Sequence, residues 1–345
     1  MSTMSVEPHS RRLEPGHQLR AKLLRSREAS IGMLLVVLVV AVRLQAASYW
    51  STSNVQIILL SIALLLVISV GELAVMIGGN FDLTVGSNVG LAAMIVGLLF
   101  KSHQGMPVVL AFGIAIAVGG IVGVINGVGI VYLRVSSVVF TLGMLSVVSG
   151  ITYLVAGGNQ VNPFNVPQRF VSLSLTSPFG VPWLVIIAFA FIVIVGASFR
   201  WTRTGRSLYA QGSNPEAAKM RGLPARRLIV LSFVLSGVAA GLAGALYLSQ
   251  YGLVQDTAGA GLELQAITIV IVGGASIYGG AGSVLGTAIS CLLLGAMANG
   301  IAVLGYSTFW QDAMYGILLV LAVVGNSISR RVETSRALVR PELKL

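Results

Sequence analysis

The residue of this chain with the clearest chemical potential is a carboxylate inside an apolar run. Glu72 is the one charged residue between about Val55 and Met76. On insertion scales a charged side chain at the bilayer centre costs about 2.5–3.5 kcal/mol, so such groups are rarely kept without a use. Two interpretations stay open: Glu72 accepts hydrogen bonds from the hydroxyls of a passing solute, or it is a protonated carboxyl bonded to a neighbouring helix.

Two glycine-rich segments interrupt the apolar pattern in a similar way. Gly78–Ser87 reads GGNFDLTVGS, and Gly273–Ser283 reads GGASIYGGAGS. Inside a bilayer an irregular backbone is tolerated only against protein or water, and transporters place such breaks beside their solute paths. Asn80 and Asp82 are therefore candidates for a solute path, although the simpler interpretation is that Asp82 caps the helix that follows.

The sequence offers no site for nucleotide or metal chemistry. None of the four lysines follows a glycine, which excludes a Walker-type phosphate loop. Cys291 is the only cysteine, so an intrachain disulfide and a thiolate metal cluster are excluded, and the three histidines fall outside the apolar runs. We therefore expect no cofactor and no catalytic residue. Any ATP that drives this protein would be hydrolysed by a partner chain.

A polar, basic segment, residues 201–227, separates two long apolar runs. Within it the sequence predicts one short helix of about two turns. Asn214 is typical of the residue that caps a helix start, and Pro215 suits the first helical position because it needs no donor. Gly222 favours a left-handed stop, and Pro224 prevents continuation. An ordinary capped helix in a loop would carry the same signals.

Composition places the whole chain in a membrane. Of its 345 residues, 56% are hydrophobic and only 10% are charged, and 41 are glycines, which let membrane helices approach closely. The mean hydropathy is +0.90. A net charge of +11 would suggest nucleic acid as the partner of a soluble protein. Here the distribution of the charge indicates membrane lipid instead, and we expect no nucleic acid.

The apolar pattern predicts an all-α, polytopic membrane protein of about ten transmembrane helices. Glycines four residues apart, such as Gly119 with Gly123 and Gly237 with Gly241, favour tight helix packing over a pore-lining role. The ten spans are expected at about 31–47, 55–76, 83–100, 107–133, 137–156, 181–199, 228–248, 262–277, 283–304 and 310–325, and the eighth is short.

An even number of spans puts both ends on one side, and the basic residues indicate which side. Six Lys and Arg lie in residues 1–30, seven in 200–227, five after residue 325 and one at Arg134, so 19 of the 22 share a face. The positive-inside rule makes this face cytoplasmic. We expect a cytoplasmic basic tail (1–30), a transmembrane domain (31–325) with the cytoplasmic segment 200–227, and a cytoplasmic C-terminal tail (326–345). The external loop Gly157–Gly180 is expected to be a plain connection, with a gate or partner contact as the alternative.

The stretch GRSLYAQGSNPEAAKMRGLPARR resembles the cytoplasmic coupling segment of bacterial ABC importer permeases, with Glu216-Ala217-Ala218 and Gly222 matching the EAA-and-Gly pattern. The likeness is greatest to the ribose-type simple-sugar permeases, which include the autoinducer-2 importers. GGNFDLTVGS is similar to their GGIDLSVGS, and GGASIYGGAGSVLGT to their GGTSLFGGRGSVLGT. Phe309-Trp310 and the basic end that follows look similar as well. The resemblance covers about residues 50–332.

The sequence departs from this family at a few positions, which leaves the solute open. Asn80 stands where Ile is usual, Ser213 where Gly is usual, and Gln265, after Glu263, where Asp is usual. Glu72 falls where many relatives carry an uncharged residue. The candidates for the translocation path are Glu72, Asn80, Asp82, Glu263 and Gln265.

The resemblance implies a non-catalytic permease subunit, multi-pass in the bacterial cytoplasmic membrane. It would pair with a second copy or paralogue, bind two ATP-binding subunits, and receive a monosaccharide-like solute from a periplasmic binding protein. ATP-driven closure would then switch the permeases between two packed states. The residues expected to couple to the ATPase are Asn214, Glu216, Ala217, Ala218, Met220, Arg221 and Gly222, the alanines and Met220 as a contact surface and the charges as register.

Two alternatives remain at this stage. A branched-chain amino acid-type ABC permease shares the architecture. An ion-coupled secondary carrier also uses interrupted helices, but it needs no coupling segment and usually carries several ionisable groups within the membrane.

Overall fold

The structure, a computed structural model, describes residues 27–175, 180–307 and 309–338, with side chains described from residue 28 to residue 326 within these ranges. The described residues form helices, and their only β-bridge joins Val161 to Val254. This confirms an all-α, polytopic membrane fold. Nine described helices are long and apolar enough to cross a bilayer. They are α2 (Arg27–Gln45), α3 (Thr52–Ile77), α4 (Val85–Ser102), α5 (Val108–Leu133), α6 (Ser137–Ala156), α8 (Trp183–Trp201), α11 (Ala225–Tyr251), α13 (Val284–Val303) and α14 (Phe309–Leu338).

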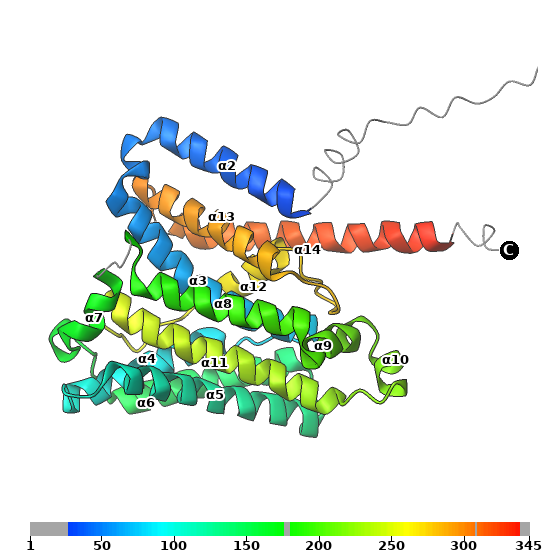
Figure 1. Ribbon diagram of the computed structural model, residues 1–345, viewed down its shortest axis with the longest axis horizontal. Helices are drawn as coiled ribbons and strands as arrows, with labels where there is room; N and C mark the ends of the chain where they lie inside the picture. The colour runs from blue at the N-terminus through cyan, green and yellow to red at the C-terminus, as the bar shows by residue number, and fades with distance from the viewer. Residues whose placement is uncertain (1–26, 176–179, 308, 339–345) are drawn as a thin grey trace, which may run out of the picture.

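The remaining helices are short and lie in the connections. They are η1 (Ala47–Trp50), η2 (Pro163–Asn165), α7 (Gln168–Leu175), α9 (Arg203–Ser213), α10 (Pro215–Met220) and α12 (Leu262–Val272). Figure 1 shows the long helices running roughly along one axis, with α9 and α10 at one end of the bundle and α7 at the other.

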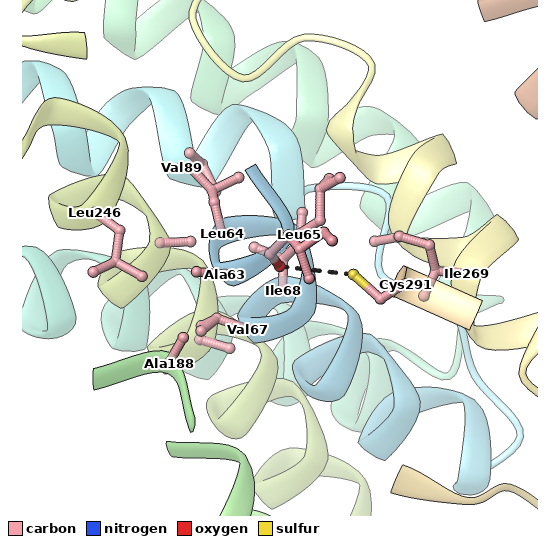
Figure 2. Packing of buried hydrophobic residues seen from close by; sticks show 14 of the residues in the cluster. Ala63, Leu64, Leu65, Val67, Ile68, Val89, Ala188, Leu246, Ile269 and Cys291 are labelled. Atoms are coloured by element: carbon pink, nitrogen blue, oxygen red, sulfur yellow. Dashed lines mark hydrogen bonds between the residues drawn. The ribbon is translucent and has the colours of Figure 1, made fainter. Parts of the chain in front are cut away.

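Helix α3 forms the centre of the bundle. Its residues Leu64, Leu65 and Ile68 are buried in one apolar cluster, packed against side chains from α4, α8, α11, α12 and α13 (Figure 2). Cys291 of α13 also lies in this cluster, with its thiol 3.7 Å from the Ile62 carbonyl oxygen. The only cysteine therefore serves as a small buried packing group.

Helices α5 and α11 cross backbone against backbone. A Cβ added to Gly119 would collide with the Gly237 carbonyl oxygen, and one added to Gly237 would collide with that of Gly119. Gly123 faces the backbone of Phe233 in the same way. The predicted use of these glycines in helix packing is confirmed, because only a hydrogen in place of a side chain permits this approach.

The eighth predicted span differs from the other nine. It is an 11-residue helix, α12. At 1.5 Å per residue α12 is about 16 Å long, roughly half of the 30 Å hydrocarbon core. The helix is short because Gly273 and Gly274 end it, and the glycine-rich segment 273–283 continues the chain.

Even so, α12 and segment 273–283 together connect the two ends of the bundle. Just before α12, Val254 exchanges two backbone hydrogen bonds of 3.0 Å with Val161 of the loop near α7. After α12, the Gly280 N–H donates to the Ile77 carbonyl oxygen, near α9. The chain therefore makes its eighth crossing with a half-length helix and an irregular segment.

Both described ends of the chain point toward the end of the bundle that carries α9 and α10 (Figure 1). This agrees with an even number of crossings. The assignment of that end to the cytoplasm stays a prediction. Of the predicted basic tail (1–30), residues 1–26 lie outside the described residues, as do residues 339–345, whereas residues 27–30 form the start of α2.

Helix α14 continues beyond the predicted end of the last span. It runs to Leu338, whereas the span was expected to end at Gly325 and to be followed by a tail. The physical reason is that no proline or glycine lies between Gly325 and Pro341 to end the helix. Most of the predicted tail is therefore helical backbone.

The loop 157–180 is more structured than a plain connection. It contains η2 and α7, and Phe170 of α7 is fully buried against Phe100 and Phe112. Arg169 donates to the backbone carbonyl oxygens of Gln104 and Met106. This loop therefore packs against the connection between α4 and α5 and is hydrogen-bonded to it.

Exchanging Gly119 for Leu tests the close crossing of α5 and α11. We expect a loss of at least about 2 kcal/mol of stability, because overpacking a tight contact typically costs 1–3 kcal/mol. Thermal unfolding of the purified chain in detergent measures it. The matched control is Gly113→Leu on the same helix, where an added Cβ meets no atom within 4 Å. Equal melting temperatures for the two variants would contradict the crossing.

Candidate functional site

The two glycine-rich segments begin with the same helix ending. After α3, Gly79 has a φ of +79°, its N–H donates to the Met76 carbonyl, and the Asn80 N–H donates to the Val75 carbonyl. After α12, Gly274 has a φ of +103° and makes the equivalent bond to Ile271. This is the Schellman arrangement, in which glycine takes the left-handed position. The GG pair that recurs in the sequence therefore marks one local structure.

Helix α10 is capped as the sequence predicts. The Asn214 side-chain oxygen accepts from the Ala217 N–H at 3.0 Å, and Pro215 is the first helical residue. At the other end Gly222 has a φ of +73°, and the Leu223 N–H donates back to the Ala218 carbonyl. The predicted short helix and its left-handed stop are confirmed.

The sequence analysis missed a second helix, α9, in the coupling segment (residues 200–227). Thr202 caps it by accepting from the Gly205 N–H at 3.0 Å, and Leu208 lies on its buried side. The signal was present in the sequence as a capping Thr before an amphipathic stretch, RTGRSLYAQGS. Tyr209 of α9 contacts the glycine-rich segment 273–283, where its hydroxyl donates to the Gly282 carbonyl at 2.9 Å. Burial raises the pKa of Tyr209.

The predicted contact residues of α10 do not share one face. Met220 is 89% exposed, and Ala217 and the charged Glu216 and Arg221 are exposed as well. Ala218, however, is only 4% exposed and faces the protein. Consecutive residues of a helix point about 100° apart, so Ala218 faces the protein while Ala217 is exposed. The predicted part of Ala218 in the ATPase contact stays a prediction.

Glu72 and Asp82 lie in a sealed polar network between α3, α5 and α11. Glu72 is 0% exposed and Asp82 is 1% exposed. The Asp82 N–H donates to Glu72 Oε1 at 3.2 Å, so Glu72 binds the turn that follows its own helix. The expected bond from Glu72 to a neighbouring helix is not found among the described residues.

Asp82 gathers donors from three elements. It accepts from the Thr84 N–H and hydroxyl, from the Ser236 hydroxyl of α11 at 2.9 Å, and from the Asn126 amide of α5 at 3.4 Å. Asp82 does not cap α4, because Thr84 is the residue before that helix. It fixes the turn by binding Thr84 instead. A solute-path role for Asp82 and Glu72 stays a prediction, and neither residue lines a described cavity.

A small polar cavity lies between α4, α6 and the segment before α12. Its volume is about 100 Å³. Two carboxylates, Asp256 and Glu263, line it together with hydroxyl groups, and no basic side chain is present. The lining residues are Ser87, Leu145, Ser149, Thr152, Tyr153, Asp256, Thr257, Ala258, Ala260 and Glu263.

Glycines on α4 allow the segment that carries the acidic residues of this cavity to pack closely against the helix. A Cβ on Gly86 would collide with Glu263 Oε2 and with the Gly259 carbonyl, and one on Gly90 would collide with the Ala258 carbonyl. Glu263 Oε1 also accepts from the Gly261 N–H at 3.2 Å, which turns its carboxylate back over the chain. The segment before α12 is thus held against α4 by its backbone.

The structure separates the five predicted path residues. Only Glu263 lines the polar cavity. Asn80 is half-buried in the turn after α3, where its amide donates to the Gly78 carbonyl at 3.2 Å, and Gln265 is half-buried on α12.

Sequence reasoning missed most of the cavity. Asp256 lies in a connection that carried no apolar pattern, and Ser149 and Thr152 lie on one face of α6 among exposed apolar residues. The three-residue spacing of Ser149 and Thr152 was a signal, because side chains at that spacing share a helix face.

Carboxylates and hydroxyls arranged in this way can accept hydrogen bonds from an uncharged polar molecule, and the hydroxyls can also donate to it. No group of three or more His, Cys, Asp or Glu side chains suited to a metal ion occurs in the described part of the chain.

Comparison with known proteins places the chain in a family. The family model described as branched-chain amino acid transport system / permease component matches residues 54–323. The autoinducer 2 import system permease protein LsrD of Photorhabdus luminescens is 30% identical over 303 residues, 86% of this chain and 90% of that protein. LsrC of Enterobacter sp. (strain 638) is 32% identical over 88% of this chain and 87% of its own length. No solved structure matches the chain.

The family model covers the chain from the start of α3 into α14, including both glycine-rich segments, the polar cavity and residues 200–227. The chain therefore belongs to the branched-chain amino acid transport system / permease component family and is a multi-pass permease of the inner membrane.

Proposed function

We propose that this chain is the transmembrane permease subunit of an ATP-driven importer for a neutral, polyhydroxylated solute such as autoinducer 2 or a monosaccharide. The observation that carries the proposal is the cavity lined by Asp256, Glu263 and several hydroxyls without a basic side chain. The names of the similar permeases, which belong to autoinducer 2 import systems, support the same solute class.

The chemistry of the cavity favours a polyol over an amino acid. Carboxylates accept hydrogen bonds from solute hydroxyls, and these charge-assisted bonds are stronger than neutral ones. An amino acid carries a carboxylate of its own, which needs a cation or a set of N–H donors. Two acidic residues in the cavity wall would repel it, so the amino acid-type permease is the weaker alternative.

The exposed tip of α10 favours an ATP-driven partner over ion coupling. Met220 is 89% exposed at the end of a helix that is firmly capped at both ends. A rigid apolar tip beside exposed charges suits a groove in a partner protein. We infer that the ATP-binding subunits bind here, with Ala217 and Met220 in contact and Glu216 and Arg221 setting the register.

A second permease copy or paralogue would complete the solute path. The cavity of about 100 Å³ is smaller than the roughly 300–1,000 Å³ of complete ligand pockets. One wall belongs to α6, whose residues Val139, Leu142 and Leu154 are exposed. We infer that a partner permease covers this region, and that a periplasmic binding protein delivers solute to the loop that contains α7.

The decisive experiment is uptake by the full chain, purified with its ATP-binding subunits and reconstituted in proteoliposomes with the cognate binding protein. We expect ATP-dependent uptake of autoinducer 2 or a pentose, and no uptake of leucine. Leucine uptake would favour the amino acid alternative. Uptake driven by an ion gradient without ATP would overturn the proposal.

Neutralising the cavity carboxylates tests their role in the same assay. Asp256→Asn and Glu263→Gln should each lower the rate of uptake about tenfold, since a hydrogen bond to a charged group contributes roughly 1.5–3 kcal/mol. The control is Asp312→Asn on α14, an exposed carboxylate outside the cavity and the coupling segment, which should leave the rate of uptake unchanged. Wild-type uptake by both cavity variants would show that solute does not bind there.

Exchanging Gly222 tests the ending of α10. The site has room, because a Cβ there meets no atom within 4 Å, but its φ of +73° disfavours β-branched residues. Gly222→Val should therefore displace α10 and uncouple ATP hydrolysis from uptake. Gly222→Asn should retain coupling, because asparagine tolerates the left-handed region. Coupled uptake by the valine variant would contradict the docking role of α10.

A further inference from the structure

Three segments meet backbone against backbone where the coupling segment joins the bundle. A Cβ on Gly212, at the end of α9, would collide with the Ile77 carbonyl oxygen and would lie 2.5 Å from the Gly280 nitrogen. The Gly280 N–H donates to that same Ile77 oxygen at 2.9 Å. A Cβ on Gly279 would lie 2.8 Å from the Gly79 Cα. The end of α3, segment 273–283 and α9 thus share one contact.

Side chains reinforce this contact, which we call the glycine junction (Ile77–Gly79, Gly212 and Gly279–Gly280). The Ser213 hydroxyl lies 3.3 Å from the Gly280 carbonyl, and the Tyr209 hydroxyl donates to the Gly282 carbonyl at 2.9 Å. Asn214, the next residue along, caps α10. Gly212 of the junction therefore lies three residues before Pro215, the first residue of the helix proposed to bind the ATPase.

We propose that the glycine junction is the place where movement of α10 passes into the membrane domain, with Gly212 as a positioning residue for transport. Where backbone touches backbone, no side chain can change rotamer to absorb a movement. A shift of α9 must therefore move Ile77 and Gly280 with it. Packed interfaces respond to such shifts by switching between discrete arrangements.

From the junction, two short routes lead to the polar cavity. On one side, the turn 78–84 leads to Ser87, whose hydroxyl donates to the Thr84 carbonyl at 3.0 Å and which lines the cavity. On the other side, segment 273–283 leads back through the 11-residue helix α12 to Glu263 near its start. Two of the elements that line the cavity, α4 with Ser87 and α12 with Glu263, are therefore connected along the chain to the junction.

The face of α9 that carries Gly212 also borders a cavity. Leu208 lies four residues before Gly212 on this face, and its Cδ1 would lie 3.2 Å from a Cβ on Gly78 of the junction. A cavity of about 350 Å³ lies between α3, α8, α9 and α11, bordered by Thr204 and Leu208 of α9 and by Leu231 of α11. Its lining contains no titratable side chain.

The proposal rests on the proposed importer function, and the test separates the two. Gly212→Ala is reconstituted in the complete transporter, and ATP hydrolysis and uptake are measured on the same proteoliposomes. We expect the ATP-binding subunits to stay bound and to hydrolyse ATP, while solute taken up per ATP falls about tenfold, a typical size for coupling between sites. A merely structural role would lower both activities together.

The matched control adds the same methyl group on the neighbouring helix. Gly196→Ala on α8 places it 3.6 Å from Val284, an ordinary contact, and should leave uptake per ATP unchanged. Should Gly212→Ala fail to assemble, Tyr209→Phe removes only the bond to Gly282 and should lower uptake per ATP by a smaller factor.

The outcomes are distinct. Wild-type protein without ATP-dependent uptake overturns the proposed function. If the wild-type protein couples uptake to ATP hydrolysis, the role of the junction is tested separately. It is overturned when Gly212→Ala assembles and takes up as much solute per ATP as the wild type. Should Gly212→Ala not assemble, the same result with Tyr209→Phe overturns it.

Discussion

A backbone that leaves its helix inside a bilayer must pair its N–H and C=O groups within the protein, and this constraint explains where the irregular segments lie. Segments 78–84, 252–261 and 273–283 each make backbone contacts with other parts of the chain. Asp82 gathers four donors around the first of them, and glycines of α4 receive the second. The third segment lies on Ile77 and Gly212. The glycine-rich composition is thus a requirement of the interrupted helices.

The same constraint divides the carboxylates into two kinds. Asp82 and Glu72 are sealed among helices, where they bind backbone and side-chain donors that would otherwise be unpaired. Asp256 and Glu263 line the cavity that we propose as part of the solute path. In the sequence, Glu72 is the most conspicuous carboxylate because it lies deep in an apolar run. Depth in the membrane, however, does not distinguish a group that holds the fold together from one that faces the solute.

Signals confined to neighbouring residues could be read from the sequence, and those that depend on distant contacts could not. The caps of α10 depend on Asn214, Pro215 and Gly222, all within one stretch, and they are as predicted. The inward position of Ala218 depends on how α10 sits on the protein. The cavity is lined by residues of α4, of α6 and by Asp256, which come from three separate regions of the chain, so no local sequence pattern predicts it. The short eighth span was predicted as a crossing, but its completion by segment 273–283 required the contacts of Gly280 with Ile77 and Gly212.

The turn after α3 unites the two functional regions of the chain. Between Ile77 and Ser87 the chain passes from the glycine junction through the Asp82 network to the wall of the cavity. If the solute path and the ATP-binding subunits were connected only through long helices, bending of those helices would absorb small movements. Here eleven residues, fixed by backbone contacts at one end and by a buried carboxylate in the middle, span the distance. We propose that a small displacement at α9 reaches the cavity through this turn, by way of the backbone contact at Ile77 and the hydrogen bonds of Asp82.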